Sequence, residues 1–138
     1  VALGVWARQD GTGIAFDSST GFTLSNGAVR SPDASWIRRA RLEQLTTRQK
    51  AKFWAVCPDF VIELRSSSDS LQKLQNKMKE YLKNGAQLGW LIDPEERQVF
   101  VYRLGHPAEH LKNPTTISGD PILPGFILDL KEIWEPDF

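Results

Sequence analysis

The segment 58–65, PDFVIELR, constrains the fold more than any other stretch of this chain. Successive side chains of a β-strand point to opposite faces, and the alternation here predicts a strand with two distinct faces. One face carries Phe60, Ile62 and Leu64, and the other carries Asp59, Val61, Glu63 and Arg65. A buried carboxylate without a partner costs several kcal/mol. Glu63 therefore lies either beside a cation, a basic partner or water, or on a half-exposed face of the sheet, and this segment alone leaves both interpretations open.

The chain after this strand predicts one helix followed by further strands. Five apolar residues follow helical spacing: Leu71, Leu74, Met78, Tyr81 and Leu82. We expect Asp69 to cap the start of a helix over 69–84 and Gly85 to follow its end. Strands are predicted at 88–92, 98–103 and 126–130, with a short closing helix around 132–134. This order predicts an α/β fold with a mixed central β-sheet flanked by helices.

The first part of the chain predicts several short elements. A helix over 3–9 is expected to end at Asp10-Gly11. Strands are expected at 13–16, 21–24 and 29–37, and Asn26-Gly27 predicts a hairpin turn before the third of them. The polar and basic stretch 38–57 is predicted to contain a short helix that begins near Thr46 or Thr47.

Composition limits the class of protein. The 138 residues fit a single domain over 1–138, and 41% hydrophobic residues exclude a disordered chain. Seventeen basic residues balance seventeen acidic ones, which is less basic than many nucleic-acid-binding proteins. The apolar runs are too short to span a bilayer, no signal peptide is visible, and the single cysteine, Cys57, favours a reducing, cytoplasmic location. Because the chain opens at Val1, we expect an N-terminal helical piece to be missing.

Asp33 is a second acid in an extended setting, because it follows Pro32 within the predicted strand 29–37. If that strand pairs with 58–65, Asp33 and Glu63 lie roughly 5 Å apart at the backbone, within reach of one divalent ion. Asp59 is a rival, but it is about 13 Å from Glu63 along the strand. We therefore expect Asp59 to mark the start of the strand with a supporting or structural role.

Carboxylates without a cysteine or histidine cluster favour Mg²⁺ or Mn²⁺ over zinc. His106 and His110 are four residues apart, but Pro107 disrupts a helix that would align them. We interpret both as surface loop histidines rather than metal ligands.

Two cations are candidates for stabilising charge on a phosphate or for positioning water. Arg65 shares a strand face with Glu63, although a guanidinium cannot accept a proton. Lys77 lies at the margin of the buried face of the helix 69–84, and its amine can reach back over the end of the sheet. The alternative for Lys77 is a side chain whose stem packs while its ammonium remains in water.

Six short motifs occur along the chain: PDASWI at 32–37, PDFVIEL at 58–64, the helix pattern Lys77–Tyr81–Gly85, WLIDP at 90–94, VFVYR at 99–103 and LPGFILDLKEIW at 123–134. Together, and in this order, they resemble the Uma family of predicted endonucleases, in the PD-(D/E)xK, restriction-endonuclease-like superfamily. The resemblance covers nearly the whole chain. It implies a mixed sheet flanked by helices, Mg²⁺-dependent (or Mn²⁺-dependent) hydrolysis of phosphodiester bonds in DNA, and a homo-oligomer, here a dimer.

The resemblance also implies roles for particular residues. It makes Asp33 the acid of the PD motif and Glu63 the second metal ligand. The lysine of the superfamily falls two residues after the glutamate, where this chain has Arg65; in the Uma group the lysine is displaced to the following helix, which matches Lys77. In the implied mechanism Lys77 positions a metal-activated water or the phosphate, and Arg65 stabilises the developing charge.

The basic segment within 38–52 is a candidate surface for DNA, with an ordinary solvated face as the alternative; its cations are Arg38, Arg39, Arg41, Arg48, Lys50 and Lys52. Two further functions compete with the endonuclease. One is a nuclease-like fold without catalysis that acts as a nucleic-acid-binding or assembly module, which Arg65 and the neutral charge favour. The other, a glycosidase with two carboxylates, needs a large sugar cleft that nothing in this short chain indicates.

Overall fold

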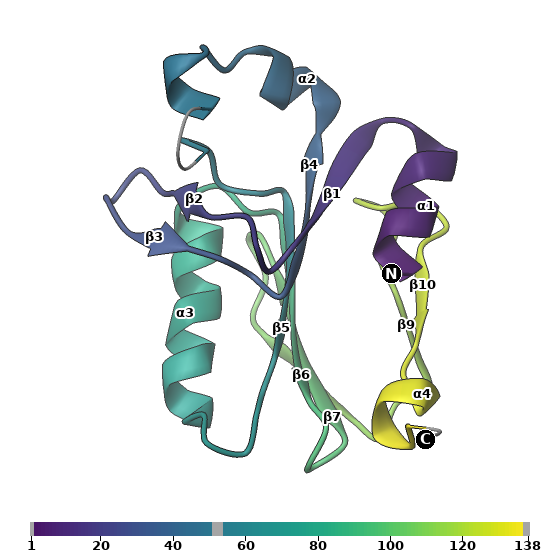
Figure 1. The fold of residues 1–138 in the computed structure, drawn as a ribbon. Coiled ribbons are helices and arrows are strands. Elements are labelled where there is room, and N and C mark those ends of the chain that lie inside the picture. Colours follow the sequence, from purple (N-terminus) through teal and green to yellow (C-terminus); the bar gives the residue numbers. More distant parts are fainter. Residues whose placement is uncertain (1, 51–53, 137–138) are drawn as a thin grey trace.

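The computed structural model describes residues 2–50 and 54–136, and its centre is a six-stranded sheet (Figure 1). In spatial order the strands are β1 (Gly13–Asp17), β4 (Ala34–Arg38), β5 (Phe60–Leu64), β6 (Leu88–Asp93), β7 (Gln98–Arg103) and β8 (Glu109–Lys112). β5 and β6 are parallel, and the other neighbours are antiparallel. The predicted mixed sheet is confirmed.

Helices and small sheets cover both faces of the central sheet. α3 (Leu71–Lys83) lies on one face, and α1 (Ala2–Asp10) and α4 (Lys131–Trp134) lie on the other (Figure 1). Two small antiparallel sheets complete the layers: β2 (Phe22–Thr23) with β3 (Val29–Arg30), and β9 (Thr116–Ser118) with β10 (Ile127–Asp129). α2 (Arg39–Glu43) and the 3-10 helix η1 (Arg48–Lys50) follow β4.

The alternation within β5 divides the core into two clusters. Phe60 and Ile62 pack with the aromatic side chains of Trp90 and Phe126 on the side of α1 and α4. Val61 packs on the opposite side with residues of α3. Both faces of β5 are therefore buried, and an acid on this strand points into the protein interior, as Glu63 does with 4% of its surface exposed.

The ends of α3 explain its position and correct one prediction. Ser70, not Asp69, caps the helix, because its hydroxyl accepts the Lys73 backbone N–H. Asp69 instead accepts hydrogen bonds from Ser66 in the preceding turn. At the other end the chain leaves the helix at Asn84 and Gly85, which has a φ of 124° that favours glycine.

The predicted strand 29–37 is wrong as a single element. The hairpin at Asn26-Gly27 is confirmed, but the strand after it divides into β3 and β4 around Ser31, Pro32 and Asp33. Proline has no N–H for a sheet ladder, so the chain bends there and β4 joins the central sheet. The break places Asp33 immediately before β4.

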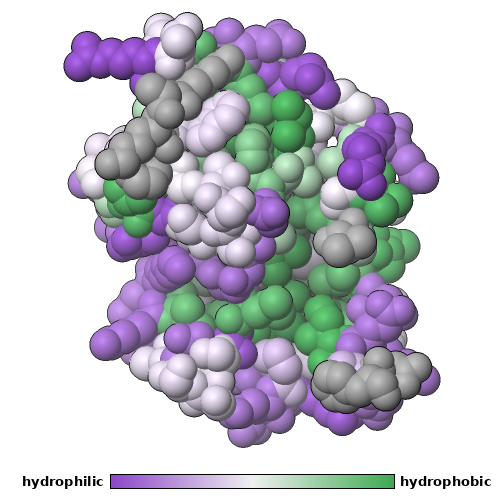
Figure 2. All heavy atoms as spheres, in the orientation of Figure 1, coloured by the Kyte–Doolittle hydropathy of each residue, from purple (hydrophilic) through white to green (hydrophobic). Residues whose placement is uncertain are grey.

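Several local elements also differ from the sequence predictions. The polar stretch after β4 forms α2, which was not predicted, and a turn of 3-10 helix near the predicted start. β8 and β9 were not predicted either, because their four and three residues carry little periodic signal. In the described part of the chain, no helix is long and apolar enough to cross a membrane. Figure 2 shows hydrophobic residues reaching the surface over the middle of one face, with hydrophilic residues around them.

Candidate active site

Asp33 and Glu63 meet at one end of the β4–β5 pair. Ala34 is opposite Ile62 in this antiparallel ladder, so the next position places Asp33 across from Glu63. The Asp33 carboxylate accepts the Leu64 backbone N–H at 2.6 Å, which ties it to β5 directly after Glu63. The two acids therefore lie close together, although they are 30 residues apart in the sequence.

Glu63 is held by two donors from α3. Its Oε2 atom lies 2.9 Å from the Lys77 ammonium and accepts the Tyr81 hydroxyl at 2.7 Å. Burial raises the pKa of Glu63 above its usual range, and the hydrogen bonds and charge of Lys77 and the hydroxyl of Tyr81 act against that rise. The negative charge of Asp33 adds to the rise, as expected for two neighbouring carboxylates.

The position of Lys77 agrees with its place at the margin of the buried helix face. Its side chain is 28% exposed, so the stem packs against the protein while the amine reaches Glu63. The structure therefore brings Asp33, Glu63 and Lys77 together at one end of the sheet.

Arg65 has a different partner from the one expected. Its guanidinium lies 2.9 Å from the carboxylate of Asp93, which is fully buried at the end of β6, and it donates a second hydrogen bond to the Asp69 carbonyl. Asp93 also accepts a hydrogen bond from Gln98. Arg65 is thus engaged in joining the loop after β5 to β6.

Asp59 and the two histidines have structural surroundings. Asp59 is buried, pairs with Arg41 at 2.9 Å and accepts the Arg38 backbone N–H. His110 lies in the edge strand β8 rather than in a loop, where its ring stacks on Phe100 at 4.5 Å between centroids. His106 lies in the exposed turn after β7, as predicted.

Only part of the predicted basic segment is available to a ligand. Arg41 is paired with Asp59, and the guanidinium of Arg38 lies over the ring of Trp36 at 5.3 Å. Arg39 and Arg48 are exposed. Lys52 lies outside the described residues, and the side chain of Lys50 is not described.

The residues at this site suit Mg²⁺ or Mn²⁺. Within the described residues, Oε1 of Glu63 and Oδ1 of Asp33 accept no hydrogen bond, so each carboxylate retains an oxygen for an ion. Residues 2–50 and 54–136 contain no group of three or more histidine, cysteine or acidic side chains that could hold a metal. Mg²⁺ commonly uses only one or two carboxylates and completes its shell with water and substrate phosphate.

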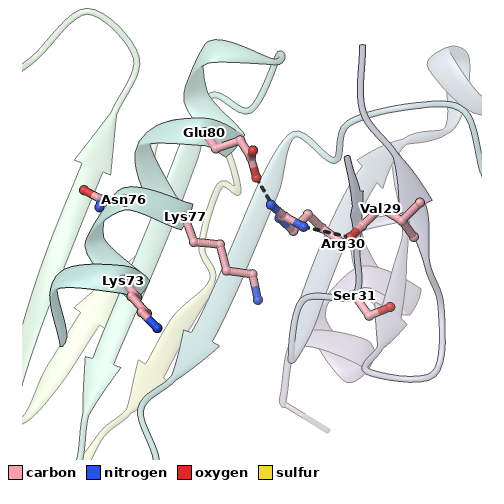
Figure 3. A pocket seen from close by; sticks show the side chains of 7 residues that line it. All are labelled: Val29, Arg30, Ser31, Lys73, Asn76, Lys77 and Glu80. Carbon is pink, nitrogen blue, oxygen red and sulfur yellow. Dashed lines mark hydrogen bonds and ion pairs between the residues drawn. The ribbon is translucent and has the colours of Figure 1, made fainter. Parts of the chain in front are cut away.

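A groove lies beside this cluster, between β3 and α3 (Figure 3). Its volume is about 600 Å³, and its polar lining comes from Arg30, Ser31, Lys73, Asn76, Lys77 and Glu80. We call it the β3–α3 groove. Lys77 extends from α3 into it, so the amine that contacts Glu63 connects the groove with the two acids.

Tyr81 and Asp93 are the residues whose contacts the sequence analysis missed. Tyr81 is also an apolar position of the helix, and its helical spacing predicted core packing rather than a hydroxyl bonded to Glu63. The signal for Asp93 was an acid at the end of the apolar run of β6, directly before Pro94. A buried acid at a strand end requires a partner, which here is Arg65.

The mixed sheet, the helices on both faces and the two acids at the end of neighbouring strands define a restriction-endonuclease-like protein. A solved structure of a putative nuclease of DUF820 from Anabaena variabilis has the same fold, with a TM-score of 0.81 and 26% identity over 96% of this chain and 74% of that chain. Residues 1–131 match the model of the Uma2 family, described as "Putative restriction endonuclease". The chain belongs to the Uma2 family.

Two other comparisons add no functional detail. The cryo-EM structure of a DrdV–DNA complex matches with a TM-score of 0.49 and 16% identity, over 99% of this chain and 11% of that chain. No curated protein matches this chain.

Proposed function

We propose that this protein is a Mg²⁺- or Mn²⁺-dependent endonuclease that hydrolyses phosphodiester bonds of DNA. The observation that carries the proposal is the buried carboxylate of Glu63, which faces Asp33 across β4 and β5 and is contacted by the Lys77 amine at 2.9 Å. Family membership and the nuclease-like fold support the same reaction class. A homodimer, which the superfamily resemblance implies, belongs to the proposal as well.

The residues of the cluster have separate tasks in this reaction. Asp33 and Glu63 would hold the ion, which, when bound, lowers the pKa of a coordinated water and offsets charge on the phosphate. Tyr81 and Lys77 fix Glu63 Oε2, so that Oε1 keeps one direction. The ammonium of Lys77 can donate a hydrogen bond to a phosphate oxygen in the β3–α3 groove, where it stabilises negative charge as the bond to phosphorus breaks.

The location of Arg65 changes its part in the proposal. Because its guanidinium pairs with the buried Asp93, we assign it to holding the end of β5 rather than to contact with the phosphate. Lys77 is therefore the cation that we assign to the reaction.

Nicking of supercoiled plasmid DNA tests this function. We expect cleavage with Mg²⁺ or Mn²⁺, none with EDTA, and a loss of more than about 100-fold in rate for Asp33→Asn and for Glu63→Gln, since each removes a charged ligand. The matched control is Glu109→Gln, which is exposed on the edge strand β8, three strands away from β5 in the central sheet. Unchanged nicking in both active-site variants rules out the assignment.

A second candidate function is a nuclease-like module that binds nucleic acid or a partner without cleavage. Two observations favour it: Arg65, in the position of the superfamily lysine, is tied to Asp93, and the net charge is zero. Calorimetric titration with Mn²⁺ separates the two functions. Binding of the ion by the wild type and its loss in Glu63→Gln support the enzyme, whereas absence of Mn²⁺ binding supports the module.

A further inference from the structure

The β3–α3 groove has an electrostatic character that the proposed reaction does not by itself require. It contains three cations, Arg30, Lys73 and Lys77, and one anion, Glu80. Glu80 is already neutralised, because Arg30 contacts it at 2.7 Å and the Asn26 amide donates to it at 3.1 Å. Lys77 is likewise paired with Glu63, so within the described residues Lys73 supplies the positive charge of the groove that no ion pair balances.

Several hydrogen-bond donors in this groove have no acceptor among the described residues. Lys73 forms no ion pair there, and the Ser31 hydroxyl is not hydrogen-bonded. The Asn76 carbonyl oxygen accepts a hydrogen bond from Gln72 at 3.0 Å, which leaves the NH₂ group of Asn76 as its available group. Lys73, Asn76 and Ser31 therefore offer an ammonium, an amide NH₂ group and a hydroxyl as hydrogen-bond donors, a set that can bind an anion.

The contacts of Glu80 also fix the shape of the groove. Through Arg30 and Asn26, Glu80 fastens the β2–β3 hairpin to α3, so the two walls are held at a set separation. The hairpin is held a second time, because Asn84 accepts hydrogen bonds from Ser25 and from the Asn26 backbone. A groove with fixed walls loses little conformational freedom when a ligand binds.

The spacing along α3 suits a chain of anions rather than a single one. Lys73 and Lys77 are four residues apart on the same face of the helix, about 6 Å along its axis. Lys77 contacts Glu63, whereas Lys73 lies one turn toward the start of the helix and forms no ion pair within the described residues. A linear ligand that places one phosphate at Lys77 therefore brings the next group to Lys73.

We propose that the β3–α3 groove binds the DNA strand beside the cleaved bond, with Lys73, Asn76 and Ser31 holding the phosphodiester group next to the scissile one. The identity of the scissile phosphate rests on the proposed function, whereas binding of the DNA strand in the groove does not. This subsite lies on α3 and β3, away from the basic segment after β4. Lys73 and Asn76 are exposed, so their replacement leaves the core intact.

Fluorescence anisotropy with a labelled DNA duplex and the matching single strand, in EDTA, tests the subsite without cleavage. We expect Lys73→Gln to weaken DNA binding about 3- to 10-fold at low salt. It should also reduce the slope of log K against log salt by about 0.9 for duplex DNA or about 0.7 for single-stranded DNA, because each phosphate contact contributes about that much to the slope. Lys73→Gln/Asn76→Ala should bind more weakly still. Lys73→Arg should restore the slope, because it restores the charge.

Two further variants locate the binding surface. Lys131→Gln, on α4 across the sheet from α3, removes the same charge and should leave affinity and slope unchanged. Arg48→Gln tests the basic segment. Unchanged affinity and slope in Lys73→Gln overturn the subsite, and a loss in Arg48→Gln alone assigns the DNA to the basic segment instead.

The same variants separate the two proposals. If wild-type protein nicks DNA with Mg²⁺ while Lys73→Gln binds and nicks normally, the subsite is wrong and the endonuclease function stands. If DNA binding depends on Lys73 but no divalent ion supports nicking, the endonuclease function is wrong and the groove remains a DNA-binding surface. Absence of any DNA binding by the wild type contradicts both.

Discussion

At the scale of single residues, the buried Glu63 carboxylate depends on its two neighbours in α3. An ionised carboxylate with 4% exposure has lost nearly all of its hydration, and the Lys77 charge and Tyr81 hydroxyl offset part of that cost. The pKa of Glu63 is nevertheless raised, so burial has the larger effect. A bound cation would therefore further stabilise the charged form of Glu63.

Tyr81 is a positioning residue in this arrangement, because its hydroxyl donates to the Glu63 carboxylate while its ring packs in the core on the side of α3. We expect Tyr81→Phe to weaken Mn²⁺ binding about 10-fold, the range found for partners that orient a metal ligand, and to destabilise the protein by about 1 kcal/mol through the lost hydrogen bond. Isothermal titration calorimetry measures the first effect and urea unfolding the second.

Tyr102→Phe is the matched control for this prediction. Tyr102 is also a buried tyrosine, with 4% exposure on β7, but within the described residues its hydroxyl forms no hydrogen bond. The Tyr102→Phe variant should bind Mn²⁺ with the same affinity as the wild type. Equal Mn²⁺ affinities for Tyr81→Phe and the wild type contradict a positioning role, even if stability falls.

At the scale of elements, the pairing of β1 with β4 requires a residue without a side chain at Gly13. A Cβ atom at this position would lie 2.5 Å from the Ile37 carbonyl oxygen and would overlap the Trp36 ring. Trp36 is fully buried in the core, and the carbonyl belongs to the backbone of β4, so neither can move easily. The close approach of these two strands therefore depends on glycine.

Replacing two glycines by alanine should have opposite effects on stability. Gly13→Ala is expected to destabilise the protein by about 2–3 kcal/mol through overpacking. Gly4→Ala, in α1 with no atom within 4 Å of the added Cβ, should stabilise it by about 0.5–1 kcal/mol because alanine favours the helix. Urea unfolding measures both changes. An unchanged free energy of unfolding in Gly13→Ala would show that β1 and β4 can move apart without destabilising the protein.

At the scale of the whole molecule, one buried acid joins three segments. Asp93, at the end of β6, holds Arg65 from the loop after β5 and Gln98 from the start of β7. Burial raises the pKa of Asp93, but the hydrogen bonds from Gln98 and Arg65 outweigh it, and the pKa is lowered overall. The folded state therefore prefers the charged form of this carboxyl.

Lowering the pH should reduce the contribution of Asp93 to the free energy of unfolding. A lowered pKa contributes stability above the pKa of an unfolded aspartate, about 3.9, and this stability is lost as the pH falls through the folded value. We expect Asp93→Asn to cost about 2 kcal/mol at neutral pH, with a difference from the wild type that shrinks toward low pH. Urea unfolding at a series of pH values measures it.

The exposed pair of Arg97 and Glu135 provides the control for Asp93. Their charged atoms are 3.4 Å apart, and their side chains are 45% and 55% exposed. Glu135→Gln should cost less than about 0.5 kcal/mol because water and salt screen the pair. A cost for Asp93→Asn as small as that for Glu135→Gln contradicts its role in joining the three segments.

The sequence was informative wherever a local pattern and burial agreed. The alternation in 58–65, the helical spacing from Leu71 to Leu82 and the two strands after it predicted β5, α3, β6 and β7 correctly. The predicted helix cap at Asp69 was wrong because Ser70, the next residue, also carries a capping oxygen. The prediction of one strand over 29–37 was wrong because apolar residues lie on both sides of Pro32, where the chain bends and divides into β3 and β4.

The sequence by itself determined the α/β class, the family and one acid, Glu63, that is unusual for its surroundings. Only the tertiary structure decided the partners: Lys77 and Tyr81 contact Glu63, whereas Arg65, nearer in the sequence, turns to Asp93. The physical reason is that periodicity fixes the face on which a side chain lies, because it follows from the backbone of one element. The residue from another element that it contacts depends on how the separate elements pack and on which buried charges they must neutralise.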